Sequence, residues 1–117
     1  MAASYIPEAG DIVWLHFDPQ AGHEQAGQRS ALVVSPAAYN AKTGLMLYCP
    51  ITTKIKGYPF EVIIDANLAG AVLADQIKSL DWVARMASYK AKITATQLEE
   101  VRKKATLLIA GQHKQKP

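Results

Sequence analysis

The stretch Asp11-Ile12-Val13-Trp14-Leu15-His16-Phe17-Asp18 decides the fold class of this chain. It is rich in β-branched and aromatic residues and is bounded by Gly10 and Pro19, which is typical of a largely buried β-strand. A polar, glycine-containing segment follows, and the chain then resumes with a second apolar run, Ala31-Leu32-Val33-Val34. The beginning of the sequence therefore predicts a strand, a loop and a second strand.

Three more strands are predicted downstream. They are Leu45 to Ile51, Phe60 to Ile64, and Ala71 to Ile77, the last continuing toward Trp82. Ser35-Pro36 predicts a short helical turn with a serine cap, and Asn40 to Gly44 predicts the turn after it. Because the strands are short and no long helix separates them, the pattern favours an antiparallel barrel or sandwich.

The pattern changes to a helical period near the end of the chain. One face of the predicted helix carries Leu98, Val101, Ala105 and Leu108, joined by Ile109. Thr94-Ala95-Thr96-Gln97 is a capping-box pattern at its start, and Gly111 suits the position after its end. We therefore expect a single domain over residues 1–111, followed by a flexible basic tail over 112–117.

Composition sets the broad class of protein. The chain has 117 residues, of which 50% are hydrophobic and 20% charged, so it can form a core and is not a disordered chain. Its net charge of +3 gives only a weak preference for polyanions. The single cysteine, Cys49, lies in an apolar run that predicts an inert buried thiol. The sequence shows neither a signal peptide nor a run of membrane-spanning length, so the expected compartment is the cytoplasm.

No cofactor or metal site is predicted. His16, His23 and His113 lack the spacing and the neighbouring ligands of a zinc site, and no glycine-rich phosphate loop is present. The candidate chemistry lies instead in the loop that runs from Gly22 to Arg29.

That loop places an imidazole, a carboxylate, a carboxamide and a guanidinium within the segment from His23 to Arg29. Attack by a ribose 2′-hydroxyl on phosphorus needs a proton acceptor, a proton donor to the leaving group and a cation, and all three types are present. The alternative is a solvated connection, which is the common role of a polar loop. The composition of the loop alone does not decide between the two.

An ordered series of motifs brings a family into view. The motifs are Tyr5-Ile6-Pro7, Gly10-Asp11, Phe17-Asp18-Pro19, Gly22 to Gly27, Arg29, Ser35-Pro36, Tyr39-Asn40, Lys42-Thr43-Gly44, Pro50, Thr52-Thr53, Lys56 to Val62, Leu73 to Gln76 and Lys78-Ser79. Together they closely resemble the MazF and PemK/Kid toxins, with MazF the more similar. The resemblance covers nearly the whole chain, to about Gly111.

This resemblance implies an SH3-like β-barrel of the CcdB/PemK type, with short antiparallel strands and a C-terminal α-helix. It also implies a homodimer and a ribosome-independent endoribonuclease that cleaves single-stranded RNA at specific sequences. The expected products are a 2′,3′-cyclic phosphate and a 5′-hydroxyl. A MazE-like antitoxin is expected to occupy the RNA-binding grooves.

The resemblance also assigns candidate catalytic residues. Arg29 and Thr52 match the arginine and threonine thought to flank the scissile phosphate. Glu24 matches an acidic residue that the family needs for activity, and His23 matches a group proposed to act in the PemK/Kid branch. Either Glu24 or His23 is the expected general base. Glu24 has the alternative role of an ion-pair partner for Arg29, and His23 that of stacking on a base.

Further residues are expected to contact RNA. They are Gln25, Thr53, Lys56, Asp75, Gln76, Lys78 and Arg85. Asp75 matches another group proposed for the PemK/Kid branch, but it is equally suited to a turn or to accepting a hydrogen bond from a base. Two positions depart from the family pattern: Ser30 stands where a proline is usual, and Leu73 stands where the PemK/Kid branch has its third catalytic group, an arginine.

Two other functions remain compatible with a barrel of this type. One is a toxin that poisons gyrase, and the other is a module that binds RNA or peptide without cutting it. The group from His23 to Arg29, together with Thr52, favours the nuclease, because a pure binding module has no need of such a set.

Overall fold

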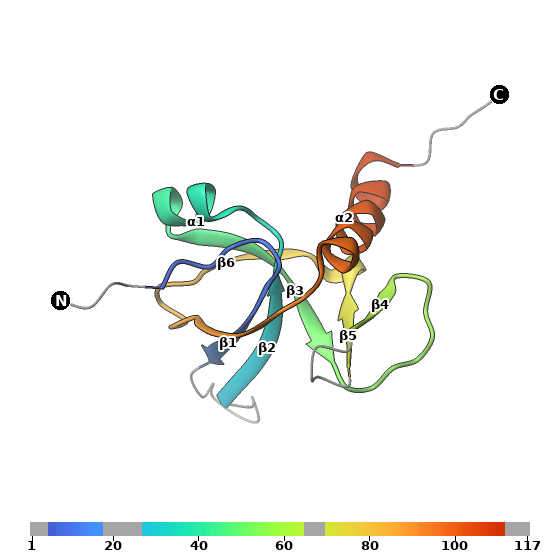
Figure 1. Cartoon of the computed structure of the whole chain (residues 1–117), viewed down its shortest axis with the longest axis horizontal. Helices are drawn as coiled ribbons and strands as arrows, with labels where there is room; N and C mark the ends of the chain where they lie inside the picture. Colours follow the sequence, from blue (N-terminus) through green and yellow to red (C-terminus); the bar gives the residue numbers. More distant parts are fainter. Residues whose placement is uncertain (1–4, 18–26, 65–69, 112–117) are drawn as a thin grey trace, which may run out of the picture.

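The chain folds into a curled antiparallel sheet with two α-helices (Figure 1). The computed structural model describes residues 5–17, 27–64 and 70–111. The strands are β1 (Asp11–Phe17), β2 (Gly27–Val33), β3 (Leu45–Thr52), β4 (Glu61–Ile64), β5 (Gly70–Leu73), β6 (Lys78–Asp81) and β7 (Ser88–Lys92). The helices are α1 (Ala37–Thr43) and α2 (Ala95–Ala110), and a 3₁₀ turn, η1, covers Ala74–Gln76. The predicted fold class, mainly β with a C-terminal helix, is confirmed.

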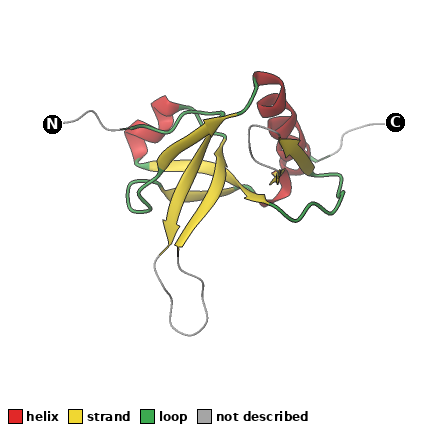
Figure 2. Ribbon diagram, turned by 60° about the horizontal axis from the view of Figure 1, so that its bottom comes forward, coloured by secondary structure: helices red, strands yellow, loops and turns green. Residues whose placement is uncertain are grey.

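Strand β3 holds the sheet together because it pairs with three other strands in succession. Its first residues, Leu45 to Tyr48, pair with β6, and its middle residues, Tyr48 to Pro50, pair with β2. Its last two residues, Ile51 and Thr52, pair with β5. The strand order is β4-β5-β3-β2-β1-β7, with β6 on β3, and the curled strands form a half-barrel (Figure 2).

Two apolar clusters pack against the two faces of this sheet. The first includes Ile12, Leu32 and Val72 and is covered by Val101 of α2. The second is built from the alternate side chains of the same strands, such as Val13, Leu15, Val33 and Met46, with Trp82 packed against it. Because side chains alternate along a strand, neighbouring residues of β1 and β2 belong to opposite faces.

The strand predicted from Ala71 toward Trp82 is divided in the structure. The 3₁₀ turn η1 separates β5 from β6, and the two strands pair with β3 in different registers. The prediction of one continuous strand was wrong because the chain changes direction where the sheet bends. This bend places Asp75 and Gln76 in a turn.

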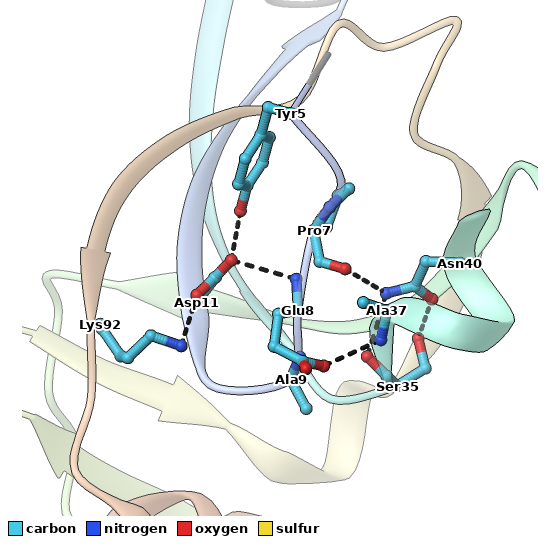
Figure 3. A network of polar contacts seen from close by, with 9 residues as sticks. All are labelled: Tyr5, Pro7, Glu8, Ala9, Asp11, Ser35, Ala37, Asn40 and Lys92. Atoms are coloured by element: carbon cyan, nitrogen blue, oxygen red, sulfur yellow. Dashed lines mark hydrogen bonds and ion pairs between the residues drawn. The ribbon is translucent and has the colours of Figure 1, made fainter. Parts of the chain in front are cut away.

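The α1 helix is longer than predicted and is capped differently. Ser35 does not cap it: its hydroxyl donates to Asn40 Oδ1 at 2.6 Å and accepts the Leu47 amide at 2.8 Å. The first helical amide, that of Ala37, instead donates to Glu8 Oε1 at 2.8 Å (Figure 3). A carboxylate distant in sequence thus satisfies an amide that the helix cannot pair internally.

The segment expected to be a turn, Asn40 to Gly44, instead forms the second half of α1. Asn40 is fully buried, and its amide donates to the Pro7 carbonyl at 2.8 Å. Gly44 ends the helix at φ 75°, in the left-handed region that glycine adopts without strain. The buried asparagine therefore ties α1 to the N-terminal segment, which the local pattern could not reveal.

Strand β7, Ser88–Lys92, was not predicted. Its sequence, Ser-Tyr-Lys-Ala-Lys, lacks an apolar run, and it lies at the end of the strand order beside β1. It is anchored at Lys92, whose ammonium contacts the carboxylate of the buried Asp11 at 2.7 Å (Figure 3). Pairing with an existing strand, rather than its own hydrophobicity, makes this segment a strand.

The C-terminal helix has the predicted capping box. The Thr94 hydroxyl accepts the Gln97 amide, and the Gln97 side chain accepts the Thr94 amide. Val101 and Ala105 are buried as expected, but Leu108 is 47% exposed and Ile109 73%. Only the first part of the predicted apolar face is therefore buried, because the last turn extends beyond the strands that cover the first turns (Figure 1).

Candidate active site

The candidate site forms where β2 and β3 part. The last residues that pair are Ala31 of β2 and Pro50 of β3. If this antiparallel register continued for two residues along each strand, Arg29 would lie directly opposite Thr52. The strands separate there instead, because β3 continues into a pair with β5. The two residues therefore lie on facing sides of a gap.

This gap is a hollow of about 660 Å³ that we call the cationic hollow. Its described lining consists of Trp14, Gln28, Arg29, Ser30, Ile51, Thr52, Thr53, Lys54, Gly70 and Lys90. Three of these residues are cationic and none carries a carboxylate, so the hollow suits a polyanion such as a nucleic-acid backbone.

A second, smaller hollow of about 230 Å³ adjoins the first. It is lined by Thr52, Lys54, Lys56, Tyr58, Phe60, Glu61, Leu73, Asp75 and Gln76. Since Thr52 and Lys54 line both hollows, the two form a continuous surface around the end of β3. Cations, two carboxylates and two aromatic rings meet here, which suits contacts with bases as well as phosphates.

The guanidinium of Arg29 is held over an aromatic ring. Its Cζ atom lies 5.7 Å from the centroid of the Phe17 ring, and Cζ of Arg85 lies 4.7 Å from the same centroid. Burial raises the pKa of Tyr48, and the positive charges of Arg85 and Arg29 partly offset that rise. Both arginines and the tyrosine thus share a region of positive potential.

The structure brings together most of the predicted site residues that it describes. Arg29, Thr52 and Thr53 line the cationic hollow, while Lys56, Asp75 and Gln76 line the second one. Lys78 and Arg85 line neither hollow; Lys78 pairs with Tyr48 across β6 and β3. The predicted residues His23, Glu24 and Gln25 lie outside the described residues.

Seven residues that line the cationic hollow were not among the predicted site residues: Trp14, Gln28, Ser30, Ile51, Lys54, Gly70 and Lys90. Trp14 was interpreted only as part of a buried strand, and Ser30 only as a departure from a family pattern. A lysine that follows two threonines, as Lys54 does, resembles any solvated lysine. Lys90 had no local signal, because its strand was not recognised.

Over residues 5–17, 27–64 and 70–111, no group of three or more His, Cys, Asp or Glu side chains is placed to hold a metal ion. Neither α1 nor α2 is long and apolar enough to cross a membrane. Cys49 is fully buried, and burial raises the pKa of its thiol to about 12.

Comparison with known proteins identifies the family. The model for the PemK-like, MazF-like toxin of type II toxin–antitoxin systems matches residues 8–109. The chain belongs to this family. It is 46% identical over 110 residues to the endoribonuclease toxin MazF of Escherichia coli K12, covering 93% of this chain and 99% of that one. It is 35% identical over 100 residues to the endoribonuclease PemK of Escherichia coli, covering 80% of this chain and 75% of that one.

Solved structures agree with this assignment. The chain superposes on a MazE–MazF crystal structure from Deinococcus radiodurans with a TM-score of 0.86 and 54% identity, covering 92% of this chain and 98% of that one. A MazF crystal structure from the same organism gives a TM-score of 0.81, also at 54% identity. The predicted membership of the MazF and PemK family is therefore confirmed.

The two departures from the family pattern both fall on the lining of the hollows. Leu73 is at the end of β5, beside η1, and lines the second hollow with an apolar side chain. Ser30 lies on β2 opposite Trp14, and its hydroxyl accepts a hydrogen bond from Lys90 Nζ at 3.0 Å. Both positions thus contribute side chains to the hollows that contain Arg29 and Thr52.

Proposed function

We propose that this chain is the toxin of a type II toxin–antitoxin system and cleaves single-stranded RNA at specific sequences, without a metal ion or the ribosome. The observation that carries the proposal is the meeting of Arg29 and Thr52 at the cationic hollow, where β2 and β3 part. Membership of the family supports it, as does 46% identity to a protein named as an endoribonuclease toxin. Cleavage of messenger RNA would stop translation.

The proposed reaction is an internal attack on phosphorus. The ribose 2′-oxygen bonds to phosphorus, its proton passes to Glu24 or His23, and the bond from phosphorus to the 5′-oxygen breaks. The leaving oxygen takes up a proton, which gives a 2′,3′-cyclic phosphate and a 5′-hydroxyl. Arg29 stabilises the added negative charge, and Thr52 hydrogen-bonds a phosphate oxygen. A guanidinium is a very weak acid, so charge stabilisation suits Arg29 better than proton donation.

The remaining predicted residues bind the RNA strand on either side of the cut. Lys56, Asp75 and Gln76 would contact nucleotides in the second hollow, and Thr53 would contact them in the cationic hollow. Gln25 is proposed to read a base edge, and Lys78 and Arg85 to extend the cationic path.

The proposal includes two protein partners. A MazF relative from Deinococcus radiodurans was crystallised with MazE, and we extend this to a MazE-like antitoxin that covers the hollows of this chain. The second partner is another copy of the chain, which would bury the exposed end of α2. The site of action is the cytoplasm, where messenger RNA is translated.

The decisive experiment incubates the purified protein with a long RNA in the presence of EDTA. Arg29→Ala and Glu24→Ala variants are tested in parallel, and Lys42→Ala, an exposed change on α1, serves as the matched control. We expect the wild type and the control to cut the RNA and both site variants to lose activity by at least about a hundredfold.

Each outcome has a separate meaning. Intact RNA with the wild type would refute the nuclease, and relaxation or cleavage assays with gyrase would then test the gyrase alternative. Cleavage that EDTA abolishes would refute only the metal-free mechanism. Full activity of Arg29→Ala would refute the assignment of the site to the cationic hollow.

A further inference from the structure

Lys90 occupies an irregular position in β7. Ile12 of β1 pairs with Ala91, whereas the next residue of β1, Val13, pairs with Tyr89. The pairing therefore skips Lys90, and β7 has one more residue than β1 at this point. Such a bulge turns a side chain away from its regular direction, and bulges are over-represented next to active sites.

The bulge directs the Lys90 side chain across β1 to β2. Its Nζ atom lies 3.7 Å from the centroid of the Trp14 ring and donates to Ser30 Oγ at 3.0 Å. Trp14 and Ser30 are direct partners across β1 and β2, so the ammonium is held by two residues of one cross-strand pair. These contacts fix a long, flexible side chain in one place, which reduces the entropy lost when it binds a ligand.

The place where the ammonium is held is the wall of the cationic hollow. Lys90, Trp14 and Ser30 all line it. An ammonium has three donors, and the contact with Ser30 uses one of them. Partial burial lowers the pKa of Lys90 from its usual 10.5. Incomplete solvation also strengthens the attraction of a cation for a phosphate.

Lys90 and Arg29 approach the hollow from different faces of the sheet. Arg29 pairs with Leu15 and extends toward Phe17, whereas the adjacent Ser30 pairs with Trp14 on the other face. The two cations therefore reach the hollow from different directions.

We infer that Lys90, fixed by Ser30 and Trp14, binds a backbone phosphate of the RNA next to the one that is cut. The inference rests on the proposed function and adds a binding residue to it. Lys90 contributes to binding of the RNA and not to the bond-breaking step. Its loss therefore raises KM and leaves kcat nearly unchanged. Ser30 is a positioning residue that acts through Lys90.

The rival interpretation is that Lys90 only fastens β7 to β1 and β2. Salt dependence separates the two roles, because each phosphate contact to a single strand contributes about 0.7 to the slope of log affinity against log salt concentration. A lysine that only fastens strands does not change that slope. The probe is a fluorescent, mixed-sequence single-stranded 2′-O-methyl RNA, which resists attack by the 2′-oxygen and reports binding without cleavage.

The experiment compares the wild type with Lys90→Gln, Lys90→Arg and Ser30→Ala. Lys42→Gln on α1 is the matched loss of one positive charge outside the hollow. We expect Lys90→Gln to weaken binding about tenfold at low salt and to reduce the slope by about 0.7. Lys90→Arg restores the slope, and Ser30→Ala gives a smaller loss of affinity with the slope retained. Thermal melting of each variant checks that it is folded.

Two results would overturn the inference. One is an unchanged slope for Lys90→Gln in a folded protein, and the other is an equal loss of slope for Lys42→Gln. If Lys90→Gln does not fold, Ser30→Ala decides: an unchanged affinity for the probe in this folded variant contradicts the role of Ser30 in holding Lys90 for a phosphate. Failure of the proposed function is distinguishable, because the wild type would then bind the probe but leave unmodified RNA intact.

Discussion

Gly70 of β5 lies so close to Thr52 of β3 that a Cβ atom added to it would come within 2.8 Å of the Thr52 carbonyl oxygen. The same Cβ would meet Ile51 Cγ2 at 3.2 Å. Since the closer contact is with backbone, no side-chain rotation can relieve it. The absence of a side chain at Gly70 thus permits the pair of β3 and β5 that sets the position of Thr52.

We therefore expect Gly70→Ala to damage catalysis through Thr52. The end of β3 must shift by a few tenths of an ångström, which misplaces the Thr52 hydroxyl toward phosphate and should lower kcat by about tenfold to a hundredfold. Cleavage rates on a defined RNA measure this effect, with the melting temperature as a check on folding. Gly44→Ala is the comparison, because it strains a helix end at φ 75° outside the hollows. An active Gly70→Ala variant would contradict the proposed link.

We expect RNA cleavage to depend on the hydroxyl group of Thr52 more than on the shape of its side chain. In the free protein this oxygen accepts the Lys54 amide at 3.0 Å, so its own proton is available for a phosphate oxygen. Thr52→Val removes that donor and should lower kcat by about a hundredfold with little change in KM. Thr52→Ser should keep most of the activity. Equal rates for the valine and serine variants would remove Thr52 from the mechanism.

The ion pair between Lys92 and Asp11 should stabilise the fold in a pH-dependent way. The bond to Asp11 raises the pKa of Lys92, so the pair stabilises the folded state below the unfolded pKa of about 10.4 and loses this effect as pH rises through the higher folded value. The Lys92 side chain is 50% exposed, which limits the gain to about 1 kcal/mol.

Denaturant unfolding of Lys92→Met tests this. The free energy of unfolding of this variant should lie below that of the wild type by a constant amount between about pH 6 and pH 9. The difference should shrink above about pH 11. Lys42→Met should show no such deficit. A deficit that persists at high pH would mean that packing of the Lys92 chain, and not its charge, stabilises the protein.

The exposed end of α2 predicts self-association. Leu107, Leu108 and Ile109 are 44%, 47% and 73% exposed, although they are consecutive apolar residues. Light scattering at micromolar concentration should give the mass of a dimer for the wild type, and Ile109→Glu should shift it toward the monomer because it buries a charge in the contact. Lys103→Gln changes the net charge by the same amount at an exposed position of the same helix and serves as the control. A monomeric wild type would refute the dimer. A dimeric Ile109→Glu variant would show that the dimer contact does not include the end of α2.

Local sequence was sufficient for much of this protein. The composition of Asp11 to Phe17 and the flanking glycine and proline predicted the first strand, and Thr94 to Gln97 predicted where the last helix begins, because capping involves neighbours in sequence. The order of motifs was sufficient to recognise the family, and with it to select Arg29 and Thr52.

The tertiary structure decided what depends on pairing between distant segments. Strand β7 forms because it can pair with the edge of β1. The predicted strand after Gly70 is divided because its two parts, β5 and β6, pair with opposite ends of β3. The setting of Lys90 depends on a bulge, a cross-strand pair and a hydrogen bond over 60 residues of sequence. No local pattern encodes such a contact, since its energy arises only when the strands have assembled.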